Sequence, residues 1–224
     1  MSKRKISFVP GEYYHLYNRG NDKRVIFHDE QDYKRFLALL FLCNSKNKVD
    51  MSELPDDIFA VPRGSSFVAI GSYCLMPNHF HILVTPLEEK GVSAFMQKIT
   101  TAYCMYYNSK YSRTGSLFEG KFKSEHANTD RYLKYLFSYI HLNPLAIIDK
   151  EWKKKGIKNK SKALDFLNAY RYSSFSEYQD KKRKESSIVN RSFFPKYFPT
   201  SISFMKEILT WISYKELPEG KAFR

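Results

Sequence analysis

Two histidines flank one phenylalanine in the segment PNHFHILV. Successive side chains of a β-strand point to opposite faces, so His79 and His81 share one face and Phe80 lies on the other. Phe80, Ile82 and Val84 then form an apolar face for a core. The two imidazoles side by side are typical of a divalent metal site, and the alternative is a pair of exposed or hydrogen-bonded strand histidines.

A phenol and an amide lie on one flank of a later helical segment, RYLKYLFSYIHLNP, residues 131–144. At about 100° per residue, Tyr139 and Asn143 are one helical turn apart beside the apolar stripe. This position permits both side chains to face the edge of a sheet, and hence the histidine strand. His141 is a rival metal ligand, but it falls on the far flank of the stripe. An Asn-Pro pair is also an ordinary helix terminator, so the alternative role of Asn143 is to end the helix, and both roles are compatible.

These residue types support one particular chemistry. Two neutral imidazoles and an oxygen donor leave open positions on Mg²⁺ or Mn²⁺, and such an ion can polarise a phosphodiester oxygen. A tyrosine hydroxylate can attack phosphorus and leave a covalent phosphotyrosine, which conserves the energy of the diester for a later rejoining. The residues therefore permit metal-dependent phosphoryl transfer.

The elements that must position these residues follow the order β-α-β-β-α-β-α. They are expected near residues 11–20, 29–42, 66–76, 79–84, 93–111, 117–127 and 131–142. Asp29 is the expected N-cap of the first helix, and Thr129 or Asp130 that of the third. This order predicts an α+β fold, with a ferredoxin-like antiparallel sheet and helices packed mainly on one face.

The character of the chain changes near residue 150. Residues 151–187 hold 11 Lys/Arg against 5 Asp/Glu, a net charge of +6. We expect a catalytic domain at 1–149 and a basic C-terminal extension at 150–224, packed on or beside it. Within that extension, residues 201–213 have the spacing of an amphipathic helix. The loop at 44–66 is longer than such a domain needs and could lie near a bound nucleic acid.

The net charge of the whole chain is +14, which indicates a polyanionic partner such as nucleic acid. Association with a membrane needs about 18 consecutive apolar residues or a basic amphipathic helix with a clean polar face, and the sequence offers neither. The segment MSKRKISFVPGEYY lacks the apolar region of a signal peptide. Three widely spaced cysteines fit reduced core thiols. These features predict a cytoplasmic protein associated with the nucleoid.

Basic side chains interleaved with aromatic ones suit a nucleic-acid groove, in which phosphates are neutralised and bases stack. The candidate DNA-binding residues are Arg19, Lys23, Arg24, Arg113, Lys121 and Lys123, and the alternative is a solvated basic surface. The lysine-rich runs at 153–155 and 181–184 either grip a hairpin stem or keep the protein soluble. His15, His28 and His126 have no partner at ligand spacing, so we interpret them as structural or DNA-contacting.

Four segments in this order, PNHFHILV, GSLFEGKFK, YIHLNP and YRYSSFSEY, resemble the bacterial REP-associated tyrosine transposases, which belong to the His-hydrophobe-His single-strand transposase superfamily. The resemblance covers roughly residues 11–180. It implies that His79, His81 and Asn143 hold the metal and that Tyr139 attacks single-stranded DNA, leaving a 5′-phosphotyrosine and a free 3′-OH. It also implies guidance by a hairpin, and it favours a monomer over a dimer.

We therefore predict a transposase-like single-strand DNA endonuclease and strand transferase that acts at hairpin-associated sites. The alternative is a non-cleaving hairpin-DNA-binding protein derived from a transposase, and the complete set of two histidines, tyrosine and asparagine argues against it. A hydrolase of the His-x-His-x-His type fails because Leu83 stands where a third histidine is needed. An RNA-binding sheet module shares the expected fold, but the strands lack its aromatic signature.

Overall fold

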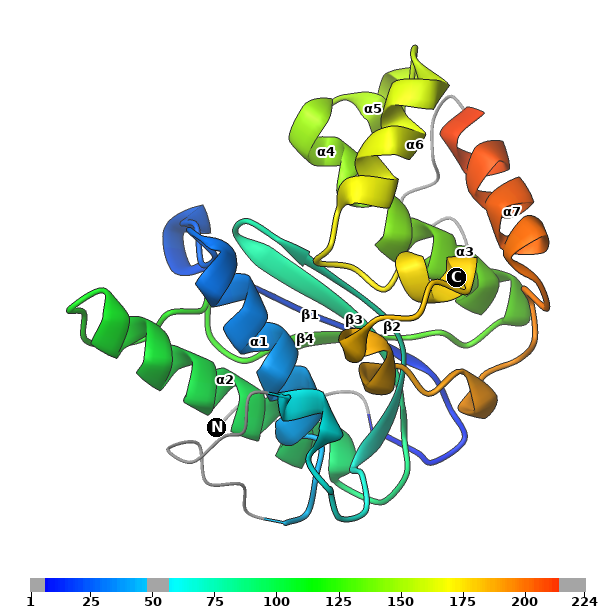
Figure 1. Ribbon diagram of the computed structural model, residues 1–224. Helices are drawn as coiled ribbons and strands as arrows, with labels where there is room; N and C mark the ends of the chain where they lie inside the picture. The colour runs from blue at the N-terminus through cyan, green and yellow to red at the C-terminus, as the bar shows by residue number, and fades with distance from the viewer. Residues whose placement is uncertain (1–6, 48–56, 214–224) are drawn as a thin grey trace.

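One four-stranded antiparallel sheet organises the molecule (Figure 1). The structure is a computed structural model that describes residues 7–47 and 57–213. The strand order across the sheet is β2-β3-β1-β4. The strands are β1 (Tyr14–Arg19), β2 (Val68–Met76), β3 (His79–Pro86) and β4 (Lys123–His126). The predicted α+β class with an antiparallel sheet is confirmed.

Helices α1 (Glu30–Leu42) and α2 (Gly91–Lys110) cover one face of the sheet (Figure 1). The predicted N-cap of α1 is confirmed, since the Asp29 carboxylate accepts from the backbone N–H of Asp32. β2 and β3 form the expected hairpin, and successive side chains of β3 point to opposite faces of the sheet. Phe80, Ile82 and Val84 lie fully buried in the core beneath α1 and α2. This places the histidines of β3 on the opposite face.

The opposite face carries helix α3 (Asp130–Leu142), which contacts β2 and β3. The Thr129 hydroxyl caps α3 by accepting from the backbone N–H of Tyr132. Helices therefore pack on both faces of the sheet, whereas the sequence predicted them mainly on one. The second face of the sheet is also apolar, at Ala69 and Leu83 among others, and the apolar stripe of α3 packs there in a second core.

The remaining helices lie C-terminal to α3. They are α4 (Leu145–Ile148), α5 (Trp152–Lys155), α6 (Lys160–Ala169) and α7 (Ser201–Ser213). Single 3₁₀ turns are η1 (Asn21–Lys23), η2 (Ile58–Ala60), η3 (Ser176–Gln179), η4 (Lys184–Ile188) and η5 (Arg191–Phe193). Helix α7 buries one side in the second core, as its spacing predicts, through Phe204, Ile208 and Ile212.

Two of the sequence expectations depend partly on residues outside the described ranges. In the long loop at 44–66, residues 48–56 lie outside them, and so does the end of the tail after residue 213. The boundary between a domain at 1–149 and an extension at 150–224 stays a prediction. Side chains from beyond residue 150, such as Trp152 and Phe175, belong to the same core as α3.

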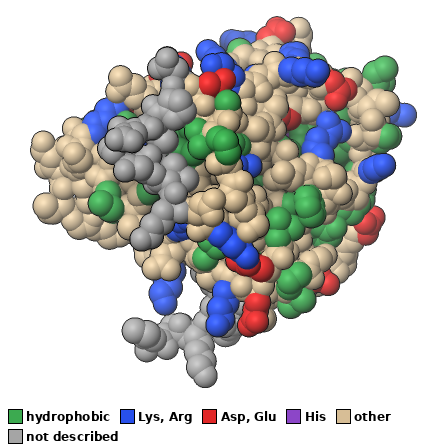
Figure 2. All heavy atoms as spheres, turned by 60° about the horizontal axis from the view of Figure 1, so that its bottom comes forward, with side chains coloured by type: hydrophobic (Ala, Val, Ile, Leu, Met, Phe, Trp, Pro, Cys, Tyr) green, Lys and Arg blue, Asp and Glu red, His purple; other side chains and the backbone are tan. Residues whose placement is uncertain are grey.

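The surface mixes charges of both signs on the face seen in Figure 2, where Lys and Arg side chains alternate with Asp and Glu and with small hydrophobic patches. The positive charge of the chain is therefore not gathered into one stripe on this face. No helix in the described ranges is long and apolar enough to cross a bilayer.

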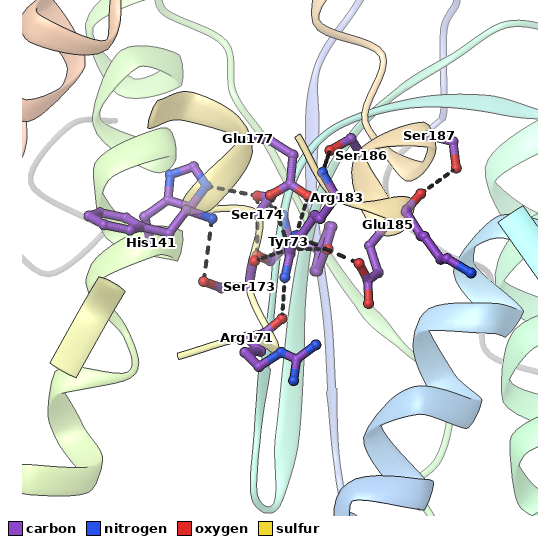
Figure 3. A network of polar contacts seen from close by, with 12 residues as sticks. Tyr73, His141, Arg171, Ser173, Ser174, Glu177, Arg183, Glu185, Ser186 and Ser187 are labelled. Atoms are coloured by element: carbon purple, nitrogen blue, oxygen red, sulfur yellow. Dashed lines mark hydrogen bonds and ion pairs between the residues drawn. The ribbon is translucent and has the colours of Figure 1, made fainter. Parts of the chain in front are cut away.

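The segment around residues 172–174 extends the sheet beside the edge strand β2. The backbone N–H of Leu75 donates to the Tyr172 carbonyl at 2.9 Å, and that of Ser174 donates to the Tyr73 carbonyl at 3.0 Å. Figure 3 shows the polar network that holds this segment, in which Arg183 is the central donor. Its guanidinium reaches the Glu177 carboxylate at 2.7 Å, and it also donates to the Tyr73 hydroxyl and the Ser173 carbonyl.

His141, the rival metal ligand, belongs to this network. It is fully buried, and its Nε2 lies 2.7 Å from the Ser174 hydroxyl (Figure 3). Burial lowers the pKa of its imidazole to about 3. The structure thus gives His141 a partner within the packed extension.

The stability of the fold is expected to fall as the pH drops below about 6.5, partly through His141. The unfolded chain takes up a proton on this imidazole below about 6.5, whereas the native chain resists it down to about 3. The destabilisation from this group is absent above pH 6.5 and reaches about 2 kcal/mol at pH 5. Urea unfolding at pH 7 and pH 5 should show a smaller pH effect in His141→Gln than in the wild type. An equal pH effect in both proteins would contradict this assignment.

Candidate active site

Strand β3 brings His79 and His81 together, with their ring centroids 4.9 Å apart. Nδ1 of His79 lies 2.6 Å from the Asn78 side-chain oxygen, and Nδ1 of His81 lies 2.9 Å from Nε2 of His15. None of the described residues forms a hydrogen bond with the Nε2 atom of either ring. The two contacts at Nδ1 therefore orient both imidazoles and leave both Nε2 atoms for a ligand, the arrangement that metal-binding histidines usually show.

Both histidines are held in the neutral form. Burial lowers the pKa of His79 to about 4, helped by the nearby Arg19. Burial also lowers the pKa of His81 well below its usual value, with a further contribution from His15. A neutral imidazole has the lone pair that a metal needs. Near neutral pH the histidine pair can therefore bind a cation without first losing protons.

Helix α3 presents Tyr139 to this pair. The centroid of its ring lies 5.7 Å from that of His81 and 6.0 Å from that of His15. Burial raises the pKa of the Tyr139 phenol, and the Glu125 carboxylate raises it further. The phenol therefore stays protonated near neutral pH until a bound group stabilises its anion.

Asn143 forms the C-cap of α3, one turn after Tyr139. Its side-chain nitrogen donates to the Tyr139 backbone carbonyl at 2.8 Å. This bond fixes the orientation of the amide and leaves its oxygen pointing away from that carbonyl. That oxygen accepts from the Lys153 ammonium at 3.4 Å. The Tyr139 ring and the Asn143 amide thus come from residues one turn apart on α3, and their joint role in the site stays a prediction.

Lys153 is a site residue that the sequence analysis missed. Its ammonium lies 4.3 Å from the centre of the Tyr139 ring, and burial lowers its pKa to about 8. In the sequence it is one of three consecutive lysines, and no local signal separates it from Lys154 and Lys155. The preceding Trp152 is buried and turns the short helix α5 so that Lys153 faces the site.

Strand β1 supplies two further residues that the sequence did not reveal. The antiparallel pairing of β1 with β3 sets Tyr17 opposite His81, so that His15 becomes its diagonal neighbour. Burial lowers the pKa of His15 to about 4. The Tyr17 hydroxyl lies 3.4 Å from Glu125 on β4, whose carboxylate also accepts from Tyr132 at 2.8 Å. Tyr17 is therefore a second phenol near the histidine pair.

The donor set fits a divalent cation with open coordination positions. Two imidazole nitrogens and one amide oxygen are available from His79, His81 and Asn143, and imidazole and amide groups are both ordinary ligands of such ions. Within residues 7–47 and 57–213, no three His, Cys, Asp or Glu side chains form a cluster that could hold a metal. The sequence predicts the Asn143 amide as the third ligand, and the roles of these residues stay predictions.

Of the candidate DNA-binding residues, the structure brings two close to the histidine pair. Arg19 and Lys123 line a cavity of about 270 Å³ together with His79 and Tyr17. Lys121 lines a separate cavity of about 930 Å³ with Phe122.

The other three are not among the residues that line these two cavities. Lys23 and Arg24 fall in and just after η1, where Arg24 forms an ion pair with Asp22. Arg113 lies over the Tyr107 ring, with 5.6 Å to its centroid. Two of the remaining histidines have structural partners, since His28 contacts the Tyr107 hydroxyl and His126 contacts Glu12.

An antiparallel sheet that presents paired histidines to a helix-borne tyrosine, in a strongly basic chain, defines a candidate nucleic-acid-processing protein. The family described as "Transposase IS200 like" matches residues 9–143, more than half of the chain. The chain belongs to this family, and the predicted resemblance to transposases is confirmed. The match includes His79, His81, Tyr139 and Asn143 and ends before Lys153.

The solved structures that are similar to this chain include the following one. It is that of a REP-associated tyrosine transposase bound to a REP hairpin, with a TM-score of 0.49 and 12% sequence identity, covering 83% of this chain and 90% of that chain. No curated protein sequence matches this chain.

Proposed function

We propose that this protein is a metal-dependent, single-tyrosine endonuclease and strand transferase of the REP-associated type, acting on single-stranded DNA beside a hairpin. The observation that carries the proposal is the placement of the Tyr139 ring 5.7 Å from that of His81, with the Asn143 amide one turn away. Membership of a transposase family supports DNA as the substrate.

The proposed reaction has one covalent intermediate. The phenol of Tyr139 gives its proton to water, which can return one to the leaving group, and its oxygen attacks the phosphorus of a single-stranded phosphodiester. The bond from phosphorus to the 3′ oxygen breaks, and that oxygen leaves with a proton as a free 3′-OH. The downstream strand stays attached as a 5′-phosphotyrosine until another 3′-OH attacks it.

His79, His81 and Asn143 would hold Mg²⁺ or Mn²⁺, which supplies positive charge to polarise the phosphate oxygens. The hydrogen bonds from Asn78 and His15 hold the two imidazoles in place for this task. Arg19 and Lys123, in the cavity beside His79, would bind the phosphates of the strand on either side. One chain suffices, because the tyrosine helix and the histidine strand meet within the same chain, and we therefore propose a monomer.

A trapping assay tests this function. The protein is incubated with single-stranded oligonucleotides that carry a hairpin from the genome encoding it, labelled at either the 5′ or the 3′ end. We expect an adduct that survives denaturation, requires Mg²⁺ or Mn²⁺ and retains the 3′ label only. Tight hairpin binding without an adduct under any metal would instead support the non-cleaving binding protein, and an adduct with the 5′ label would reverse the proposed polarity.

A further inference from the structure

The short helix α5 directs only one of its three lysines into the candidate active site. Trp152 anchors the helix in the second core, with 1% of its surface exposed. Lys154 and Lys155 are exposed, and Lys155 forms an ion pair with Glu151. Lys153 points the other way, toward the Tyr139 ring and the Asn143 amide oxygen.

The Lys153 ammonium has no acidic partner within 4.0 Å in the described part of the chain. The Glu125 carboxylate, which raises the pKa of the Tyr139 phenol, is engaged by the Tyr17 and Tyr132 hydroxyls. The Lys153 ammonium contacts the Tyr139 and Trp152 rings and the Asn143 amide oxygen.

A partly buried cation without a counter-charge is costly, and buried charges are as a rule paired, so an anionic ligand is the partner that Lys153 lacks. The anion must lie within reach of both the ammonium and the Tyr139 oxygen, because Lys153 lies against that ring. A lysine is a flexible point charge with three donors, and it suits a phosphate whose charge changes during a reaction. A phosphodiester between the two side chains meets these conditions.

We propose that Lys153 is a catalytic residue that binds a non-bridging oxygen of the scissile phosphate beside Tyr139. This inference rests on the proposed function and extends its site beyond the residues that the family match covers. The ammonium leaves the Asn143 oxygen and donates to the phosphate when DNA enters. It then stabilises the charge that builds on the phosphate oxygens as the phenol oxygen attacks and the 3′ oxygen leaves.

Two measurements on Lys153→Met test the proposal, with Lys158→Met as the matched control because Lys158 is an exposed lysine five residues further on. In single-turnover trapping with saturating hairpin DNA, we expect adduct formation to slow about 100-fold or more in Lys153→Met. Lys153→Arg should recover part of the rate, and Lys158→Met should keep it.

The second measurement does not require cleavage. In a Tyr139→Phe background, a single-stranded oligonucleotide should bind about tenfold more weakly after Lys153→Met, the loss expected for one charge-assisted hydrogen bond. If the wild type forms no adduct, the proposed function fails, and this binding difference alone decides the role of Lys153. Equal behaviour of Lys153→Met and Lys158→Met in both measurements would overturn the proposal. Should Lys153→Met fail to fold, Lys153→Gln takes its place in the same comparison.

Discussion

Replacing Tyr139 with phenylalanine is expected to abolish the covalent protein–DNA adduct while leaving hairpin binding nearly unchanged. The substitution removes one oxygen atom, and the ring keeps its contacts with His15, His81 and Lys153. Without the oxygen no phosphotyrosine can form at this position, so the amount of adduct should fall by more than about 10³-fold. Denaturing gel electrophoresis of labelled hairpin DNA measures the adduct, and fluorescence anisotropy measures binding.

Tyr17→Phe is the matched control for this experiment. Tyr17 is the other phenol near the histidine pair, with its ring centroid 6.1 Å from that of His81. We expect this variant to form the adduct, because its hydroxyl is directed to Glu125 and not to the space beside Asn143. An adduct that persists in Tyr139→Phe and disappears in Tyr17→Phe would show that β1 and not α3 supplies the nucleophile.

The second large effect is on stability. Arg183→Met is expected to lower the free energy of unfolding by about 3–5 kcal/mol, because it leaves the Glu177 carboxylate buried without its partner. The Glu177 side chain is only 4% exposed, and the bond to Arg183 is 2.7 Å long. The same substitution removes the donors to the Ser173 carbonyl and the Tyr73 hydroxyl, which hold the extension against β2 (Figure 3). Urea unfolding monitored by tryptophan fluorescence measures the change.

Two further variants test whether the unpaired Glu177 charge causes this loss of stability. The double variant Glu177→Gln with Arg183→Met removes the stranded charge, and we expect it to be more stable than Arg183→Met alone. Lys34→Met breaks an exposed ion pair with Glu30 and should cost less than about 1 kcal/mol. If Arg183→Met were as mild as Lys34→Met, the network in Figure 3 would contribute little to the docking of the extension.

Features that depend on backbone geometry within one element were predictable from the sequence alone. The alternation of β3 placed Phe80 in a core and both histidines on the other face, since successive strand residues must point to opposite sides. Helical rotation likewise put Tyr139 and Asn143 on one flank of α3. The caps at Asp29 and Thr129 follow from side-chain oxygens that accept from backbone N–H groups three residues ahead.

Features that depend on contacts between distant segments were decided by the tertiary structure. His15 meets His81 only because β1 pairs with β3 in one particular register. Lys153 faces Tyr139 only because Trp152 is buried against the second core. Helix α3 lies on the face opposite α1 because Ala69 and Leu83 make that face apolar too. Local periodicity determines which residues share one side of a helix or strand, whereas long-range packing determines which other elements that side contacts.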